Sequence, residues 1–131
     1  MIRLDNRELM NLAIEAQKRA YTPHFRFNVG AAILTHTDKI FCGCNIENPS
    51  FCATICAERT AICKMITAGE RVIRKIAVVG STQDFCAPCG ICLQAISEFL
   101  EQNGKIILTN AEGELKELGL VELYPMPVTK K

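Results

Sequence analysis

The chain has 131 residues, of which 49% are hydrophobic and 22% charged, a composition typical of one folded domain and not of a disordered polypeptide. No apolar run approaches the length of a transmembrane helix, and the opening residues MIRLDNRELM lack the apolar core of a secretion signal, so we expect a cytoplasmic protein without a membrane partner. The formal net charge is +1 with both signs interspersed, which disfavours nucleic acid as a partner.

The first half of the chain predicts one helix followed by a β-hairpin. Apolar residues at helical spacing predict a helix over 6–20, with Asn6 as its N-cap and Pro23 just beyond its end. Runs of small and β-branched residues around a turn then predict two paired strands, over 28–35 and 40–46.

The second half of the chain alternates helices with strands. A helix is predicted over 56–68, and the continuous apolar run at 75–81 is typical of a strand covered on both faces. A further helix over 90–102 precedes two strands, over 105–109 and 114–118. We therefore expect a single α/β domain over 1–131, with one mixed β-sheet of about five strands sandwiched between helices in three layers.

The eight cysteines of this chain are many for a protein expected in the cytosol, where disulfides are rare. Cys89 and Cys92 form a C-x-x-C pair at the start of one predicted helix, and Cys56 stands at the start of another, 33 positions earlier. Helix N-termini favour thiolates, and three thiolates around zinc leave a fourth position open, as in catalytic zinc sites.

Glu58 stands two positions after Cys56, in the first turn of the same predicted helix. Zinc lowers the pKa of a bound water to about 7, and a neighbouring group must then move the proton. Side chains of a helix tilt toward its N-terminus, so Glu58 is expected to reach back to the metal. A C-x-E element followed by P-C-x-x-C is the signature of zinc deaminases.

Four segments occur in the order and spacing of one enzyme family: FRFNVGAAIL, GCNIEN, CAERTA and PCGIC-x-Q. From about Tyr21 to Pro125, the chain resembles the short homotetrameric cytidine deaminases that act on free nucleosides. The resemblance implies zinc-dependent hydrolytic deamination of cytidine and 2'-deoxycytidine to uridine and 2'-deoxyuridine, with release of ammonia, in pyrimidine salvage. It also implies a homotetramer with sites near the subunit borders.

The same resemblance implies a role for each site residue. Cys56, Cys89 and Cys92 would bind one Zn²⁺ per subunit. Glu58 would take a proton from the water that attacks C4 of cytosine, pass it to N3, and later help the amine to leave. The substrate-binding residues implied by the family are Phe27 against the nucleoside, Asn45 and Glu47 at the ribose hydroxyl, and the backbone of Ala57 at the base edge.

Two positions depart from the family pattern. Leu93 stands where the family usually has an arginine, and Val128 stands near the C-terminal position where an aromatic residue usually stacks on the base. Because arginines offset the negative charge of a zinc–thiolate cluster, we expect Arg59 to provide this charge compensation alone. The Val128 position predicts a looser base pocket.

The remaining cysteines and the histidines are predicted to have structural or incidental roles. Core positions are expected for Cys42, Cys44 and Cys63. Positions near the site without a role in it are expected for Cys52 and Cys86, and surface positions for His24 and His36.

Two alternative functions stay open at this point. The first is a non-catalytic module with a closed four-sulfur zinc site, its fourth ligand being Cys42, Cys44 or Cys52; Glu58 argues against it, because a closed site needs no proton shuttle. The second is a deaminase acting on an aminated nucleoside antibiotic or on a polynucleotide. The GCNIEN segment favours a free ribonucleoside over the first of these, and the balanced charge disfavours the second.

Overall fold

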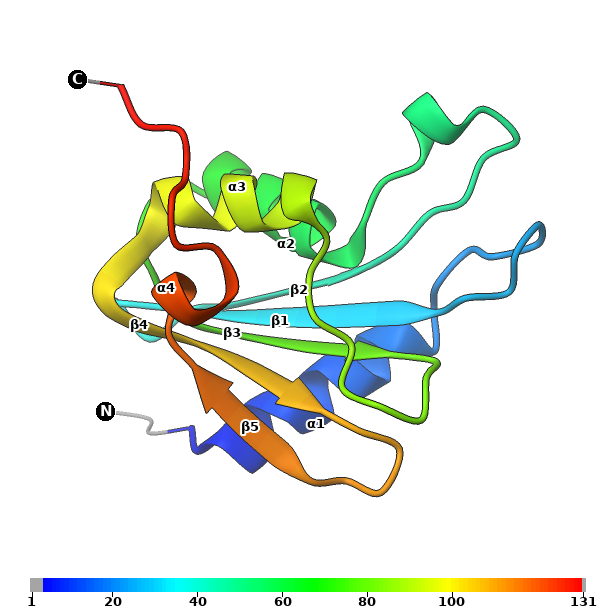
Figure 1. Ribbon diagram of the computed structural model, residues 1–131, viewed down its shortest axis with the longest axis horizontal. Helices are drawn as coiled ribbons and strands as arrows, with labels where there is room; N and C mark the ends of the chain where they lie inside the picture. Colours follow the sequence, from blue (N-terminus) through cyan, green and yellow to red (C-terminus); the bar gives the residue numbers. More distant parts are fainter. Residues whose placement is uncertain (1–3, 131) are drawn as a thin grey trace.

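A computed structural model describes residues 4–130 of the chain. One long N-terminal helix is followed by a hairpin and then by alternating helices and strands (Figure 1). In chain order the elements are α1 (Asn6–Gln17), β1 (Val29–Thr35), β2 (Ile40–Cys44), the 3₁₀ turn η1 (Phe51–Ala53), α2 (Ala57–Thr67), β3 (Ile73–Gly80), α3 (Gly90–Phe99), β4 (Leu100–Thr109), β5 (Leu115–Leu118) and α4 (Leu120–Leu123).

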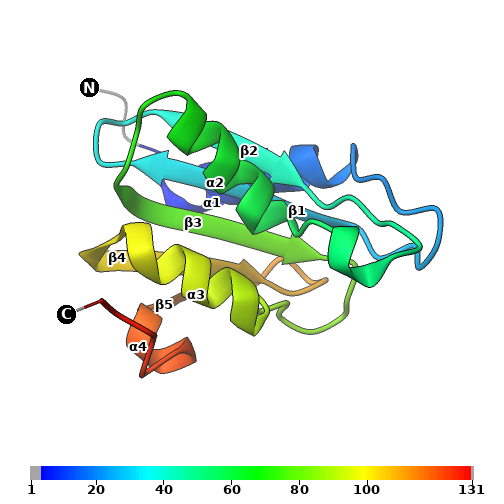
Figure 2. The same cartoon turned by 90° about the horizontal axis from the view of Figure 1, so that it is seen from above.

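The strands form one five-stranded sheet in the order β2-β1-β3-β4-β5. Strand β1 pairs antiparallel with β2 and β3, β3 pairs parallel with β4, and β5 returns antiparallel to β4. Helix α1 covers one face of the sheet, and α2 and α3 lie side by side on the other (Figures 1 and 2). The predicted mixed sheet between two layers of helices is therefore confirmed. Among the described residues, no helix combines the length and apolar character needed to cross a bilayer.

The two faces of the sheet bury separate apolar clusters. On strand β3, Ile76 and Val78 face the α2/α3 side, while Ala77 and Val79 face α1. This alternation explains why the sequence of β3 is a continuous apolar run, since a central strand between two helical layers has no solvent-facing side. The strand predicted over 75–81 is confirmed, with its start at Ile73.

Helix α1 differs at both ends from the helix predicted over 6–20. Its N-cap is Asp5, not Asn6: the Asp5 carboxylate accepts the Glu8 backbone N–H at 2.8 Å, and Glu8 accepts the Asp5 N–H at 3.2 Å, which completes a capping box. The helix stops at Gln17, because the chain then turns so that the Tyr21 N–H can bond to the Asn45 carbonyl.

The helix predicted over 90–102 was too long. It ends at Phe99, and Leu100 begins strand β4 without any connecting residue. Pairing of Leu100 with Ile73 of β3 explains the early end, because contact with a strand distant in sequence overrides local helical preference. The predicted hairpin and the strand over 114–118 are confirmed within a few residues, and α4 was not predicted.

Two cysteine predictions also need correction. Cys63 is exposed, because the buried stripe of α2 consists of Ala57, Ala61 and Met65 together with their neighbours Glu58 and Ile62. Cys44 is only half-buried, whereas the half-buried Cys42 packs against the α1-side cluster, in partial agreement with its predicted core position. His24 and His36 are exposed as predicted.

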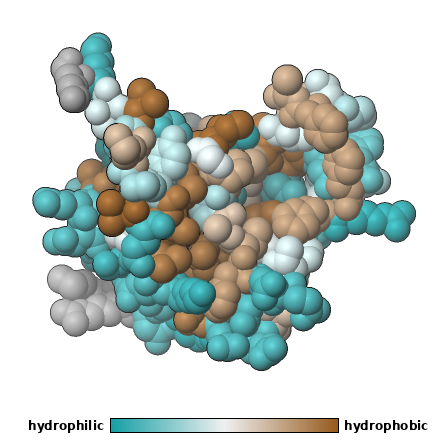
Figure 3. Space-filling view, viewed as in Figure 1, coloured by the Kyte–Doolittle hydropathy of each residue, from teal (hydrophilic) through white to brown (hydrophobic). Residues whose placement is uncertain are grey.

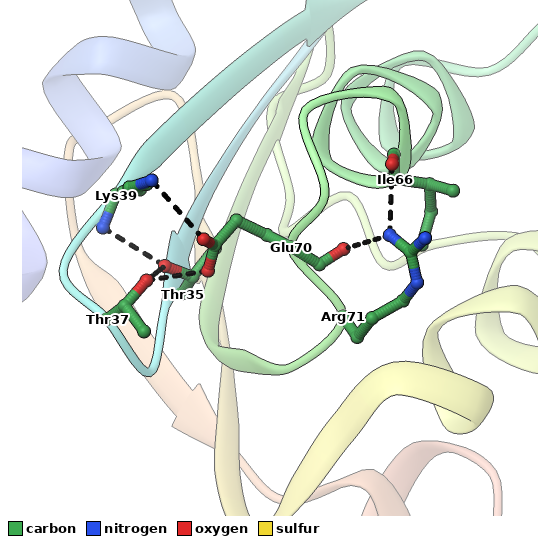
Figure 4. Close-up of polar contacts among 6 residues, drawn as sticks. All are labelled: Thr35, Thr37, Lys39, Ile66, Glu70 and Arg71. Carbon is green, nitrogen blue, oxygen red and sulfur yellow. Dashed lines mark hydrogen bonds and ion pairs between the residues drawn. The ribbon is translucent and has the colours of Figure 1, made fainter.

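A polar network ties the β1–β2 turn to the segment after α2, at the end of α2 remote from Cys56 (Figure 4). The Glu70 carboxylate accepts the Thr37 hydroxyl at 2.6 Å and lies 3.4 Å from the Lys39 ammonium group. The Lys39 backbone N–H in turn donates to the buried Thr35 hydroxyl at 3.0 Å. This network fixes the turn against the end of α2.

Candidate active site

The first turns of α2 and α3 bring three cysteines together. The sulfur atoms of Cys56, Cys89 and Cys92 all lie within 4.8 Å of one another, and those of Cys56 and Cys89 are 3.8 Å apart. Two sulfurs bound tetrahedrally to zinc at about 2.3 Å would be separated by about 3.8 Å, whereas a disulfide needs about 2.05 Å. The cluster of three thiols is therefore positioned to bind a metal ion, and its geometry fits zinc.

Close packing against the hairpin sets the position of α2. A methyl group added at Gly43 of β2 would lie 2.6 Å from the Ala57 carbonyl oxygen and 2.6 Å from the Ala61 nitrogen, so only glycine admits the helix this near. Cys56 and Cys89 are the N-cap residues of α2 and α3, which places both thiols at the positive end of a helix dipole, where the thiolate form is favoured.

Neighbouring groups favour ionisation of Cys56. Its pKa is lowered to about 5, mainly by a hydrogen bond from Cys92 and further by Arg59, whose Nη2 lies 3.7 Å from the Cys56 sulfur. The same hydrogen bond and burial raise the pKa of Cys92. The Arg59 Nε atom is buried without a hydrogen-bond partner among the described residues. A cation next to the thiols supports the predicted charge compensation.

Glu58 is buried, with 3% of its surface exposed, and it lines the same cavity as Cys56 and Cys89. Burial raises its pKa to about 7, and the negative charge of Cys56 adds to the effect. A carboxyl group with such a pKa can both accept and donate a proton near neutral pH. The structure thus brings together the predicted shuttle and two of the predicted metal ligands at one cavity.

The cavity has a volume of about 230 Å³, and its lining comes from the start of α2, from the loop that precedes α3 and from the loops before β1 and after β2. The last two loops project beyond the sheet (Figure 1). Three of the four residues predicted to bind substrate line the cavity: Phe27, Asn45 and Glu47. The fourth, Ala57, is fully buried between Cys56 and Glu58 and is not among the lining residues. The remaining lining residues are Val29, Ile46, Thr54, Ile55, Cys56, Glu58, Cys86, Ala87 and Cys89.

The Glu47 carboxylate organises the loop that precedes β1. It accepts the backbone N–H groups of Phe25 at 2.7 Å, His24 at 2.9 Å and Phe27 at 3.4 Å. Although burial opposes ionisation, these N–H donors together hold the pKa of Glu47 below its usual range. Glu47 is therefore a charged group at the cavity whose position is fixed by backbone contacts.

Asn45 fixes the neighbouring segment with both ends of its amide. Its side-chain nitrogen donates to the Phe27 carbonyl at 2.7 Å, and its side-chain oxygen accepts the Val29 N–H at 2.8 Å. Phe27 is held in this way at the cavity with 36% of its surface exposed. The short motif GCNIEN thus supplies both Asn45 and Glu47 as anchors of the segment that contains Phe27.

Cys86 lines the cavity, which confirms its predicted position near the site. No motif signals this position, because it depends on how the loop between β3 and α3 folds. Cys52 is exposed on η1 and is not among the residues that line the cavity. The candidates for a fourth sulfur ligand, Cys42, Cys44 and Cys52, do not join the metal-binding group found within residues 4–130.

The two departures from the family pattern have clear structural settings. Leu93 is buried, 7% exposed, in the apolar cluster beneath α2 and α3. Val128 is 77% exposed, and its backbone forms two hydrogen bonds of 3.0 Å with the side chain of Gln94 on α3. Helix α3 therefore holds the C-terminal segment as well as two of the thiols.

Three thiols that fit zinc, joined by no fourth protein ligand within residues 4–130, and a buried carboxyl group at the same cavity define a zinc site of the hydrolytic type. Comparison with known proteins agrees with this class. Residues 4–109 match the family model described as the cytidine and deoxycytidylate deaminase zinc-binding region. The chain belongs to this family.

Individual relatives extend the similarity over nearly the whole chain. A cytidine deaminase from Sporosarcina psychrophila is 38% identical over 128 residues, covering 98% of this chain and 94% of the relative. A cytidine deaminase from Halalkalibacterium halodurans is 41% identical over 122 residues, covering 93% of this chain and 92% of the relative. The crystal structure of cytidine deaminase from Burkholderia pseudomallei superposes on this chain with a TM-score of 0.90 at 38% identity. The match covers 95% of this chain and 100% of the Burkholderia chain.

Proposed function

We propose that this protein hydrolyses cytidine and 2'-deoxycytidine to uridine and 2'-deoxyuridine with release of ammonia, as an enzyme of nucleoside salvage. The observation that supports this function best is the placement of the buried Glu58 at the same cavity as the thiols of Cys56 and Cys89. The family match and the relatives described as cytidine deaminases support the same reaction. We further propose that the protein works in the cytoplasm.

Cys56, Cys89 and Cys92 would hold one zinc ion per chain. When bound, the ion supplies Lewis acidity, which lowers the pKa of a coordinated water to about 7. Glu58 accepts the proton of the attacking water, delivers it to N3 of the pyrimidine, and helps the amine depart from C4. Its burial removes competing bulk water from this proton path.

The nucleoside would lie in the cavity against Phe27, with its sugar toward Asn45 and Glu47. The Glu47 carboxylate can accept a ribose hydroxyl in addition to its backbone donors, because two carboxylate oxygens offer about four acceptor positions. Such a charge-assisted bond is worth about 1.5–3 kcal/mol. The backbone N–H of Ala57, at the start of α2, is proposed to donate to the base edge.

We propose a homotetramer with active sites near the subunit borders. Phe25 and Phe51, which belong to the two projecting loops, are 55% and 71% exposed and stack on each other with ring centroids 5.3 Å apart. Ile91 at the start of α3 is 65% exposed. Apolar side chains gather on the face formed by α3, α4 and the projecting loops (Figure 3), and burial between subunits would remove this surface from water.

The test is an ultraviolet assay of the zinc-loaded protein with cytidine and 2'-deoxycytidine, run before and after treatment with a chelator. We expect both nucleosides to be deaminated, and the activity to disappear with the chelator and return with added zinc. Cytidine 5'-monophosphate serves as a comparison substrate for a free-nucleoside enzyme. Zinc binding without turnover of any of these compounds would instead indicate a structural metal module.

A further inference from the structure

The carboxyl end of strand β3 contacts the segment that presents Phe27 to the cavity. The Ser81 hydroxyl accepts the Asn28 backbone N–H at 3.0 Å and donates to the Asn28 carbonyl at 3.0 Å. Next to it, a methyl group added at Gly80 would lie 2.6 Å from the Cys86 sulfur and 3.2 Å from Cζ of Phe27. Strand β3 thus meets the Phe27 segment by hydrogen bonds at one residue and by close packing at the next.

The segment 27–29 is held by side chains from several elements. Asn45 binds the Phe27 carbonyl and the Val29 N–H, which leaves Asn28 between them. The Asn28 carbonyl has a second donor, the Gln17 side chain at 3.0 Å, but Ser81 provides the partner found for the Asn28 N–H. Loss of the Ser81 hydroxyl therefore removes the partner found for the Asn28 N–H, whereas Gln17 still binds the Asn28 carbonyl and Thr22 still donates to the Asn28 side chain.

We infer that Gly80 and Ser81 are positioning residues for substrate binding, which act by holding Phe27 at the nucleoside cavity. This inference rests on the proposed function, because Phe27 is assigned there to the nucleoside. Gly80 provides the space in which the Phe27 ring and the Cys86 thiol pack side by side, and Ser81 fixes the backbone next to Phe27. Within residues 4–130, the hydrogen bonds of the Ser81 side chain and the three atoms nearest to a methyl group at Gly80 involve none of the thiols that fit zinc, so we expect an effect on substrate affinity and not on the metal.

The first experiment compares Ser81→Ala with Thr82→Ala in the zinc-loaded protein. The adjacent Thr82 hydroxyl donates only within its own loop, to the Asp84 carbonyl at 2.7 Å, and so matches the chemical change without touching the Phe27 segment. We expect Ser81→Ala to raise KM for cytidine about two- to tenfold, the range expected for loss of one net hydrogen bond. Its kcat and zinc content should be unchanged, and Thr82→Ala should match the wild type in all three.

The second experiment is a rescue. Gly80→Ala should raise KM more than Ser81→Ala does, because the new methyl group overlaps the Cys86 sulfur. The double variant Gly80→Ala/Cys86→Gly removes that overlap and should recover much of the lost affinity, with Cys86→Gly alone as the control. Equilibrium binding of uridine should follow the same order as KM.

The outcomes separate this inference from the proposed function. A wild-type protein that deaminates no nucleoside contradicts the proposed function itself. An active wild type with an unchanged KM in Ser81→Ala, or with an equal rise in Thr82→Ala, overturns the positioning role. A fall in kcat together with zinc loss in Ser81→Ala also overturns it, because the contact would then serve the metal loop.

Discussion

The ammonium group of Lys116 lies 4.4 Å from the ring centroid of Phe85, so that strand β5 contacts the loop leading to Cys89. A second contact from the β4–β5 turn, the Ala111 N–H to the Gln83 carbonyl at 3.0 Å, holds the same loop. The half-buried Phe85 also packs against the main apolar cluster. The loop that contains a predicted zinc ligand is therefore anchored to the edge of the sheet.

Replacing Lys116 should loosen this loop. We expect Lys116→Met to lower the free energy of unfolding by about 0.5–1 kcal/mol, the size of an exposed cation–π contact, and to speed the release of zinc to a chelator. Lys116→Arg should retain the wild-type behaviour. Lys18→Met, which removes an exposed charge on the far helix, is the matched control. Equal zinc release from both Met variants would contradict the anchoring role.

The shuttle role of Glu58 predicts a separation of metal binding from catalysis. Glu58→Gln keeps the shape of the buried side chain but cannot accept the proton, so kcat should fall by at least about 10²–10⁴-fold. Zinc content and the free energy of unfolding should stay close to the wild-type values. Measured turnover near that of the wild type would remove Glu58 from the mechanism.

The thiol cluster predicts one zinc ion per chain. Cys89→Ala should lose both zinc and activity, because it removes one of three ligands, whereas Cys42→Ala should keep both. Metal analysis by mass spectrometry of the intact protein and a colorimetric zinc assay provide the measurement. Two zinc ions per chain, or a Cys42→Ala variant without zinc, would favour a structural metal site instead.

Arg59 should matter more than an ordinary surface arginine, since it lies beside Cys56 and Leu93 offers no charge. We expect Arg59→Ala to lower kcat severely or to release zinc, with the exposed Arg19→Ala as control. Leu93→Arg should raise kcat or move the acidic limb of its pH profile downward, because added positive charge leaves bound zinc a stronger Lewis acid.

The burial of Leu93 sets a condition on that experiment. A longer side chain in a packed cluster costs about 1–3 kcal/mol, so the stability of Leu93→Arg must be measured beside its activity. A folded, zinc-loaded Leu93→Arg with unchanged kcat and pH profile would show that another group neutralises the thiolates.

Glu70 predicts a pH-dependent contribution to stability. Its pKa is lowered, chiefly by the hydrogen bond from Thr37 and with help from Lys39, so the charged form is favoured in the folded state. The contribution is present above the ordinary carboxyl pKa and is lost as the pH falls through the lowered value. Glu70→Gln should therefore be less stable than the wild type at pH 7, and this difference should shrink in acid. The measurement is the free energy of unfolding of both proteins at pH 7 and at an acidic pH, with Glu98→Gln, at an exposed position, as the control.

Much of the site was predictable because its chemistry lies in short motifs at helix starts. Cys56 with Glu58, and Cys89 with Cys92, are each close in sequence, and helix geometry alone places their side chains near a helix N-terminus. The roles of Gly80 and Ser81 were not predictable, because they depend on the approach of segments far apart in the chain.

The fold shows the same division. The continuous apolar run of β3 indicates burial between two layers, so the position of this strand could be predicted from local sequence. The boundary between α3 and β4 could not, since residues 100–104 have no strong strand pattern and β4 begins where Leu100 pairs with Ile73 of β3. Local patterns thus predict elements well where burial is uniform, and poorly where a distant partner decides.

The thiols that fit zinc lie on both sides of β3 in the sequence, with Cys56 before this central strand and Cys89 after it. A metal ion bound by both thiols would link positions that are 33 residues apart and so close a loop of chain that contains the central strand β3. Binding to the folded state alone stabilises it by mass action, so cells short of zinc would hold more unfolded chain. Proteases remove such chains, and we expect the cellular abundance of this protein, as well as its catalysis, to follow the zinc supply.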